Sequence, residues 1–239
     1  MGHGLTGNLG ESAQDARDMA ELSGSRQSVA TVTAWQCYLA ALRGDLDLAL
    51  RLSEEVMEVT GGRREFLAGM VFGPLAFVAL HTGDPPTCTE MLTGALHRPE
   101  PVGVASIDRM VWYNLLAEAA ALLGRPNEAA SWADRAQSEI RPWSPPRRTD
   151  LAHTARAHAL FSTSPACALD HAKAATALFT SVGDPVAAGQ AHLLAGRALN
   201  TLARPHEART TFSRARTLFD GCGARFFALK ALDEEHPAG

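Results

Sequence analysis

Small side chains recur about every forty residues along this chain, and this periodicity constrains the fold more than any other feature. Five residues after each of five successive turn signals the side chain is small, and the spacings between these positions are 39, 41, 39 and 40 residues. The five positions, called anchors below, are Ala49, Cys88, Ala129, Ala168 and Ala208. A second row of small or modest side chains follows seven residues later, at Val56, Ala95, Ala136, Ala175 and Ala215. Positions seven apart lie on one face of an α-helix, where small side chains let a neighbouring helix approach closely, so the pattern predicts stacked helices.

Turn residues divide each repeat into two helices. One set of turns lies at residues 44–45, 83–84, 124–126, 163–165 and 203–205, and a second set lies at 24, 61–62, 98–99, 142–146, 183–185 and 221–223. Glycine suits the left-handed conformation that follows a helix, aspartate accepts hydrogen bonds from the free amides of the next helix, and proline fits its first turn. The sequence therefore predicts an all-α solenoid of tandem antiparallel helical hairpins.

Composition favours helices and argues against two classes of partner. Hydrophobic residues make up 46% of the chain and aromatic residues only 6%, so alanine and leucine carry the apolar faces and few β-branched runs exist to form strands. The formal net charge of −4 makes direct binding to nucleic acid or to a membrane surface unexpected, because both depend on clustered cations. The locally basic stretch at residues 197–230 is explained by a solvated helix face or by docking onto an acidic partner.

The cysteines and the longest apolar run favour a cytoplasmic protein. The four cysteines lie too far apart for a C-x-x-C motif, which is typical of free thiols in a reducing compartment. The longest apolar run, residues 66–80, is 15 residues long and contains Gly69, Gly73 and Pro74, so it is too short and too interrupted for a membrane span. These three residues predict either a kink that opens a groove or a site of close helix packing.

One continuous domain is expected, because no linker rich in glycine, serine or proline divides the 239 residues. We expect a flexible N-terminus at residues 1–10, a single solenoid at residues 11–233 and a flexible tail at residues 234–239. Residues 11–23 look like a lone second helix, and residues 225–233 like a capping helix whose outer face carries Asp233, Glu234 and Glu235 into water. The right-handed solenoid then contains about five and a half helical pairs, and its exposed flanks allow a homodimer.

Three segments resemble the turn and second-helix start of tetratricopeptide repeats. They are residues 44–49 (GDLDLA), 124–129 (GRPNEA) and 204–208 (RPHEA), and the match recurs in five pairs over nearly the whole chain. The aromatic and glycine signature of the first helix is mostly absent, and the period is near forty residues instead of about thirty-four, which indicates a divergent subfamily. Residues 180–185 (TSVGDP) and 216–224 (RTLFDGCGA) are similar to the helical sensor region of large ATP-dependent LuxR-type regulators of the maltose-activator kind.

That resemblance implies the sensor region of a bacterial transcriptional regulator, with a small molecule or a partner protein held in its concave groove. Regulators of this kind carry a nucleotide-binding domain before the repeats and a helix-turn-helix after them. Here no G-x-x-x-x-G-K-[ST] motif is present, and too few residues follow Lys230 for a DNA-binding domain. We therefore expect either an excised sensor segment or a free-standing relative, with no direct contact to nucleic acid.

In the resembling family the first helices line the inner curve, so candidate ligand-binding positions lie 18, 15 and 11 residues before the anchors. The candidates chosen from these positions are Thr31, Tyr38, Met70, Phe77, Asn114, Glu118, Asp150, His153, Gln190 and Arg197. The first two repeats offer an apolar, aromatic groove, and the later three offer a polar groove with both signs of charge. Such a groove suits an organic ligand or a peptide, although a plain solvated surface has the same pattern.

Catalysis and metal binding receive less support. His153 with Asp150 or Glu118 could form a general base and its orienting acid, but nothing marks a nucleophile, so no catalytic residue is assigned. His153, His158 and His192 invite a metal site, but no carboxylate lies at ligand spacing beside them, so neither a metal nor a cofactor is expected. Two alternatives to a sensor stay open: a stand-alone biosynthetic enzyme or small-molecule-binding accessory protein, and an adaptor that binds peptide segments.

Overall fold

The computed structural model describes residues 15, 18, 26–60, 68–96, 106–142, 144 and 146–236. Within these ranges the chain forms eleven α-helices and no strand. The helices are α3 (Arg26–Arg43), α4 (Leu46–Thr60), α5 (Ala68–His81), α6 (Pro85–Leu96), α7 (Ser106–Leu122), α8 (Pro126–Ser138), α9 (Pro146–Leu160), α10 (Pro165–Ser181), α11 (Pro185–Thr201), α12 (Pro205–Cys222) and α13 (Arg225–Glu235). The predicted fold class, an α-solenoid of tandem helical hairpins, is confirmed.

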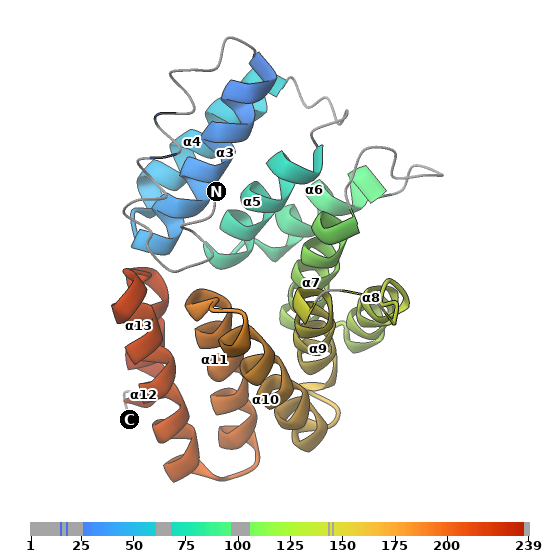
Figure 1. The fold of residues 1–239 in the computed structure, drawn as a ribbon, viewed down its shortest axis with the longest axis vertical. Coiled ribbons are helices and arrows are strands. Elements are labelled where there is room, and N and C mark those ends of the chain that lie inside the picture. The colour runs from blue at the N-terminus through green and yellow to red at the C-terminus, as the bar shows by residue number, and fades with distance from the viewer. Residues whose placement is uncertain are drawn as a thin grey trace.

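The helices form five antiparallel pairs, α3–α4 to α11–α12, followed by α13. The first helices of the pairs, α3, α5, α7, α9 and α11, contact one another in sequence order and form an inner row. Each second helix contacts its own partner and the first helix that follows it. Figure 1 shows the pairs following one another around a ring, so that α13 returns beside α3. One face of each first helix therefore points toward the interior of this ring.

The anchors lie where the second helices press against their neighbours. All five, from Ala49 to Ala208, are 0% exposed. In the second row, the side chain of Ala95 lies outside the described residues, and the other four are buried: Val56, Ala136, Ala175 and Ala215. The predicted packing role of the small side chains is confirmed, because a larger residue at these positions would hold the helices apart.

At the α11–α12 interface, two glycines have almost no room for an added side chain. Glycines of α11 receive phenylalanine rings of α12: Gly189 receives Phe219, and Gly196 receives Phe212. A Cβ atom added at Gly196 would lie 2.4 Å from Cε1 of Phe212, well inside van der Waals contact. Both rings are completely buried. Glycine here provides space for an aromatic ring.

The turns follow the predicted chemistry. Gly124 adopts a left-handed φ of +69° after α7. The carboxylate of Asp84 accepts a hydrogen bond from the N–H of Thr87 at 3.0 Å and so caps the start of α6. The turn between α11 and α12 has no glycine, and Ala203 adopts a φ of 56° there. This conformation costs an alanine about 1 kcal/mol, because its Cβ approaches the following carbonyl oxygen.

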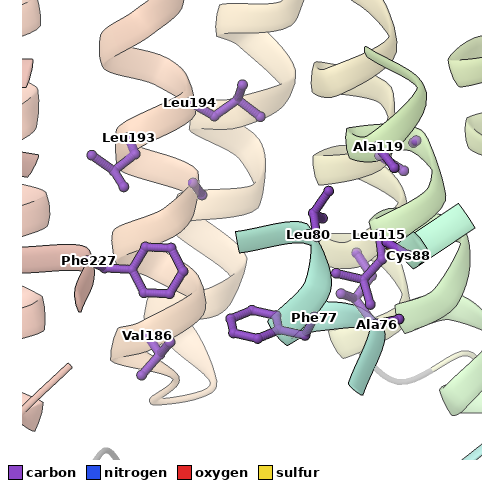
Figure 2. Close-up of a cluster of buried hydrophobic side chains, with 14 of the residues drawn as sticks. Ala76, Phe77, Leu80, Cys88, Leu115, Ala119, Val186, Leu193, Leu194 and Phe227 are labelled. Atoms are coloured by element: carbon purple, nitrogen blue, oxygen red, sulfur yellow. The ribbon is translucent and has the colours of Figure 1, made fainter. Parts of the chain in front are cut away.

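Helix α13 closes the inner curve that the sequence predicted to be open. Phe227 of α13 packs edge-on against Phe77 of α5, with ring centroids 6.0 Å apart, and Phe77 is only 8% exposed. The backbone of Phe226 lies against Gly44 at the end of α3. Figure 2 shows the rings of Phe77 and Phe227 pointing toward each other, with Leu193 of α11 in the same cluster. The aromatic groove expected along the first two repeats is therefore filled by the chain itself.

The apolar run of α5 serves close packing. The helix continues through Pro74. A Cβ atom added at Gly73 would lie 3.2 Å from Nε1 of Trp112 in α7, so this glycine lets the two helices approach. Across the part of the chain that the structure describes, no helix has the length and apolar character needed to cross a membrane.

The C-terminal boundary differs from the prediction. Helix α13 runs to Glu235, beyond the expected end of the solenoid at residue 233. Asp233 is exposed, but Glu234 pairs with Arg197 and Glu235 with Arg216, so the expectation that both glutamates project into water is wrong. They are covered because α13 lies against the preceding repeat and not at its outer edge. The predicted termini at 1–10 and 237–239, and the lone helix at 11–23 except for residues 15 and 18, lie outside the described residues.

Candidate functional site

Ionisable side chains from five helices gather on the interior side of the ring. We call them the inner cluster: His81 (α5), Glu118 (α7), His158 (α9), Arg197 (α11), and Lys230 and Glu234 (α13). They lie close enough to influence one another electrostatically, since the pKa of Glu118 responds to four other members. Buried charges are costly unless they pair with one another or bind something, so this cluster is the candidate site.

The repeat explains why these residues meet. Glu118 and Arg197 stand eleven residues before their anchors, the position that Phe77 occupies in α5. His81 follows Phe77 by one helical turn, and His158 is one residue past the equivalent position of α9. Residues one turn apart lie on the same helix face. Equivalent positions of successive hairpins therefore face the same interior.

Arg197 and Glu234 form a bidentate ion pair. Nε of Arg197 donates to the two carboxylate oxygens of Glu234 at 2.8 and 3.0 Å, and the side chains are 26% and 25% exposed. Burial alone lowers the pKa of Arg197, but the hydrogen bonds and the charge of Glu234 outweigh it and hold that pKa above its ordinary value. The pair fastens α13 to α11 and satisfies both charges.

Glu118 has only a distant partner. Its Oε2 lies 3.7 Å from Nε2 of His158, which is longer than a hydrogen bond, and the side chains are 14% and 12% exposed. Burial lowers the pKa of His158 although Glu118 opposes the shift, so this imidazole is neutral at neutral pH. Burial raises the pKa of Glu118, but His158, His81 and the nearby cations more than offset it, and the pKa is lowered overall. Glu118 is therefore a buried, charged carboxylate without a direct cationic partner among the described residues.

His81 combines aromatic packing with an unused nitrogen. Its ring centroid lies 4.2 Å from that of Phe77 and 5.1 Å from that of Phe227. Nε2 is buried and has no hydrogen-bond partner within the described residues. Burial lowers the pKa of His81 to about 4, with Glu118 opposing the shift and Lys230 adding to it. The ring is therefore neutral at neutral pH.

Asn114 extends the polar face of α7. It lies one turn before Glu118 and so shares that face. Its Oδ1 is buried and accepts no hydrogen bond from any residue that the structure describes. A buried polar atom without a partner costs about 1–3 kcal/mol. Asn114, Glu118 and His81 thus present hydrogen-bonding capacity that the protein does not use.

The two candidates on α9 lie outside the inner cluster. Nδ1 of His153 is 2.8 Å from Nδ1 of His171 in α10, so this imidazole is engaged within its own hairpin. Asp150 is completely buried, and its Oδ1 accepts a hydrogen bond from the N–H of Leu151 at 2.6 Å. Neither residue is among the groups that influence the pKa of Glu118.

Of the remaining candidates, some are packed in the interior and others are partly exposed to solvent. Tyr38 packs edge-on against Phe77, with centroids 4.7 Å apart, at the aromatic contact with α13. Thr31 is buried in α3, whereas Met70 and Gln190 are half-buried. Of the ten predicted residues, Glu118 and Arg197 belong to the inner cluster, and Asn114 lies one turn before Glu118 on α7.

Four members of the inner cluster were not among the predicted site residues: His81, His158, Lys230 and Glu234. His81 could have been predicted from the sequence, because it lies one helical turn after Phe77 and so shares its helix face. The last two lie on α13, which follows α12 in the place that a further first helix would take. Because residues 225–233 were interpreted as a capping helix, their side chains were not considered as site residues.

The inner cluster is suited to binding a polar organic molecule. It offers both signs of charge, neutral imidazoles and unused acceptors at partly exposed side chains. Among the residues described, no group of three or more His, Cys, Asp or Glu side chains could hold a metal ion.

Comparison with known proteins supports the fold. No protein-family model matches the chain, and no curated protein matches it. A Signal Transduction ATPase with Numerous Domains (STAND) protein with a tetratricopeptide repeat sensor, from Pyrococcus horikoshii, is similar in structure, with a TM-score of 0.62 and 14% identity over 90% of this chain and 32% of that chain. BtubC (BKLC) from P. vanneervenii gives a TM-score of 0.55 and 17% identity over 89% of each chain. The chain thus spans about a third of the length of the first protein, and at these identities the similarity shows the fold alone.

Proposed function

We propose that this chain is a ligand-sensing repeat module that binds a small polar molecule at the inner cluster. The observation that supports this proposal is a set of interior polar groups with little or no pairing among the described residues: Nε2 of His81 and Oδ1 of Asn114 have no hydrogen-bond partner, and the carboxylate of Glu118 has only His158 at 3.7 Å. Their burial costs free energy that folding alone does not recover, whereas a bound molecule with matching donors and acceptors recovers it.

The position of the inner cluster suits sensing. Its members come from α5, α7, α9, α11 and α13, so a molecule bound there contacts five successive helical units at once. A ligand that favours one arrangement of these units shifts the protein toward that arrangement by its difference in affinity. Binding at the interior would thereby change the relative placement of the first and last repeats.

Within this proposal, the chain is the sensor region of a bacterial LuxR-type transcriptional regulator. Support comes from the resemblance of residues 180–185 and 216–224 to such sensors. The P. horikoshii neighbour also carries its tetratricopeptide repeats as the sensor of a larger ATPase. The match with this chain covers 32% of that ATPase. In such an arrangement the ligand-bound ring would act on domains supplied by a longer protein.

A thermal-shift screen of the chain against metabolites and peptides tests the proposal. We expect at least one metabolite to raise the melting temperature, because a ligand that binds only the folded state stabilises it. That rise should disappear in Glu118→Gln and persist in Glu128→Gln, a matched change on the outside of α8. Stabilisation by peptides alone would favour the adaptor, and a flat response to both collections would reject the proposal.

A further inference from the structure

Two opposite charges of the inner cluster lack direct partners. Arg197 and Glu234 satisfy each other, which leaves Glu118 and Lys230. Glu118 has only the neutral His158 at 3.7 Å. Nζ of Lys230 lies over the ring of Phe226 at 5.8 Å, and within the described residues it forms no ion pair with Glu118 or any other carboxylate.

The two charges nevertheless belong to the same cluster, because Lys230 lies one turn before Glu234 on α13, and Glu234 pairs with Arg197, which holds the same register position as Glu118. Each affects the pKa of the other, and both affect the pKa of His81. Each of the two charged side chains also has a neutral polar neighbour with an unused hydrogen-bonding atom. Asn114 stands one turn from Glu118, and its Oδ1 has no hydrogen-bond partner within the described residues. Nε2 of His81 also has none there, and His81 and Lys230 both lie near the ring of Phe226, at 6.3 Å between ring centroids and 5.8 Å from Nζ. The interior thus has an anionic part rich in acceptors and a cationic part with an imidazole.

We infer that the ligand is a small zwitterion that carries both an ammonium group and a carboxylate, such as an amino acid; this inference rests on the proposed function. The ammonium group would donate to the carboxylate of Glu118 and to Oδ1 of Asn114. The ligand carboxylate would accept from Nζ of Lys230 and from Nε2–H of the neutral His81. Each half of the ligand would then meet one charged and one neutral partner.

The same arrangement discriminates against ligands of a single charge. An amine without a carboxylate pairs with Glu118 but leaves Lys230 unsatisfied, and an organic acid does the reverse. A site that retains an unpaired buried group binds the incomplete analogue more weakly. A purely anionic ligand has less to gain from Arg197, because its charge is already paired with Glu234 through Nε and one terminal nitrogen.

Isothermal titration calorimetry on the whole chain tests this inference. The probes are the twenty standard L-amino acids, β-alanine and γ-aminobutyrate, which separate the two charges by different distances. Each amino acid that binds is compared with its amine lacking the carboxylate and its acid lacking the ammonium group. We expect the zwitterion to bind at least about tenfold more tightly than either analogue, since one charge-assisted hydrogen bond contributes about that factor or more.

Matched variants assign the two ends. Glu118→Gln and Lys230→Gln should each weaken zwitterion binding about tenfold or more, and each should reduce discrimination against only one analogue: the acid for Glu118→Gln and the amine for Lys230→Gln. Glu128→Gln on α8, where the side chain is 35% exposed and pairs with Arg125, and Lys173→Gln at an exposed site on α10 make the same changes away from the inner cluster and should bind like the unaltered chain. Circular dichroism establishes that each variant is folded. If Glu118→Gln does not fold, Glu118→Asp keeps the charge and shifts it, and it should still weaken binding.

The outcomes separate this inference from the function on which it rests. If no probe binds but a metabolite of another class stabilises the chain through Glu118, the zwitterion is wrong and the sensing function stands. If an amino acid binds equally well to both inner-cluster variants, the assigned site is wrong. If no small molecule stabilises the chain in the wider screen, the proposed function itself falls.

Discussion

The α11–α12 interface and the inner cluster bury their side chains in opposite ways. At the interface, the rings of Phe212 and Phe219 fill space that Gly196 and Gly189 leave for them, so apolar surface meets apolar surface without a gap. In the inner cluster, ionisable side chains from five helices lie in the interior, and Nε2 of His81, like Oδ1 of Asn114 beside Glu118 on α7, has no hydrogen-bond partner within the described residues. The interface therefore offers a ligand no polar group to pair with, whereas the inner cluster offers such groups.

The difference teaches where stability and binding reside in this fold. Tight apolar packing contributes to stability in proportion to the apolar surface removed from water, and a substitution that opens a cavity reduces that stability. Unpartnered buried polar groups reduce stability and create affinity for a complementary molecule. Changes at the interface should therefore act on unfolding, and changes in the inner cluster should act on pH dependence and on ligands.

The largest effect is expected at the interface. Phe212→Ala should lower the free energy of unfolding by about 3–5 kcal/mol, because it removes a fully buried ring whose site on α11 has no side chain that could fill the space. Urea denaturation followed by circular dichroism measures the loss. A loss below about 1 kcal/mol would mean that the interface collapses easily and that the contrast with the inner cluster is weaker than proposed.

The next effect concerns pH. The folded chain holds His81 neutral, with a pKa of about 4 against 6.5 when unfolded, so the unfolded chain binds more protons between these values and stability falls as the pH drops through that window. The full contribution is about 3 kcal/mol. His81→Phe keeps an aromatic ring but cannot bind a proton. It should therefore be more stable than the unaltered chain at pH 4 by up to that amount and differ little at pH 7.

The neighbours of His81 titrate too, so the comparison between variants is the decisive measurement. Glu118, Lys230, His158 and Arg197 all influence it, and they remain in both proteins. His206→Gln, at an exposed site on α12, serves as the control and should follow the unaltered chain. Parallel stability curves for the unaltered chain and His81→Phe would show that His81 is not held neutral by burial.

A smaller loss is expected from adding one methyl group to the interface. Gly196→Ala should destabilise by about 1–3 kcal/mol, because the new Cβ overlaps the ring of Phe212 and outweighs the better helix propensity of alanine. Gly221→Ala is the control, since no atom lies within 4 Å of the added Cβ, and it should not destabilise. In the double variant with Phe212→Leu the two losses should not add, because the smaller side chain relieves the overlap.

The smallest effect is a gain. Ala203→Gly should stabilise by up to about 0.5 kcal/mol, because glycine relieves the strain of about 1 kcal/mol at a φ of 56° but loses more conformational freedom on folding, which offsets at least half of that gain. Gly183→Ala, at a φ of +70° with open space around the added Cβ, should show the opposite sign. Thermal unfolding measures both, and the same sign for the two changes would contradict the role of backbone strain at these turns.

Sequence predicted the packing of the anchors better than the inner cluster for a physical reason. Anchors such as Ala49 and Ala208 report a local requirement, the close approach of adjacent helices, and that requirement repeats with every hairpin. Glu118 and Arg197 were found because they share a register position. The return of α13 to α3 was not found, because it depends on small rotations that accumulate over five pairs and leave no periodic mark on the sequence. His153 shows the same limit, since its spacing matched the pattern but its imidazole turned toward His171.

The contact of Phe227 with Phe77 changes how a repeat protein of this kind unfolds. In an open array each unit depends only on its neighbours, so the terminal hairpins can fray while the middle stays intact. Here the first and last described helices support each other, and losing either one removes contacts from both. Backbone amides of α3 and α13 should therefore exchange with solvent at similar rates. Because this contact joins segments far apart in the chain, it is expected to form late in folding.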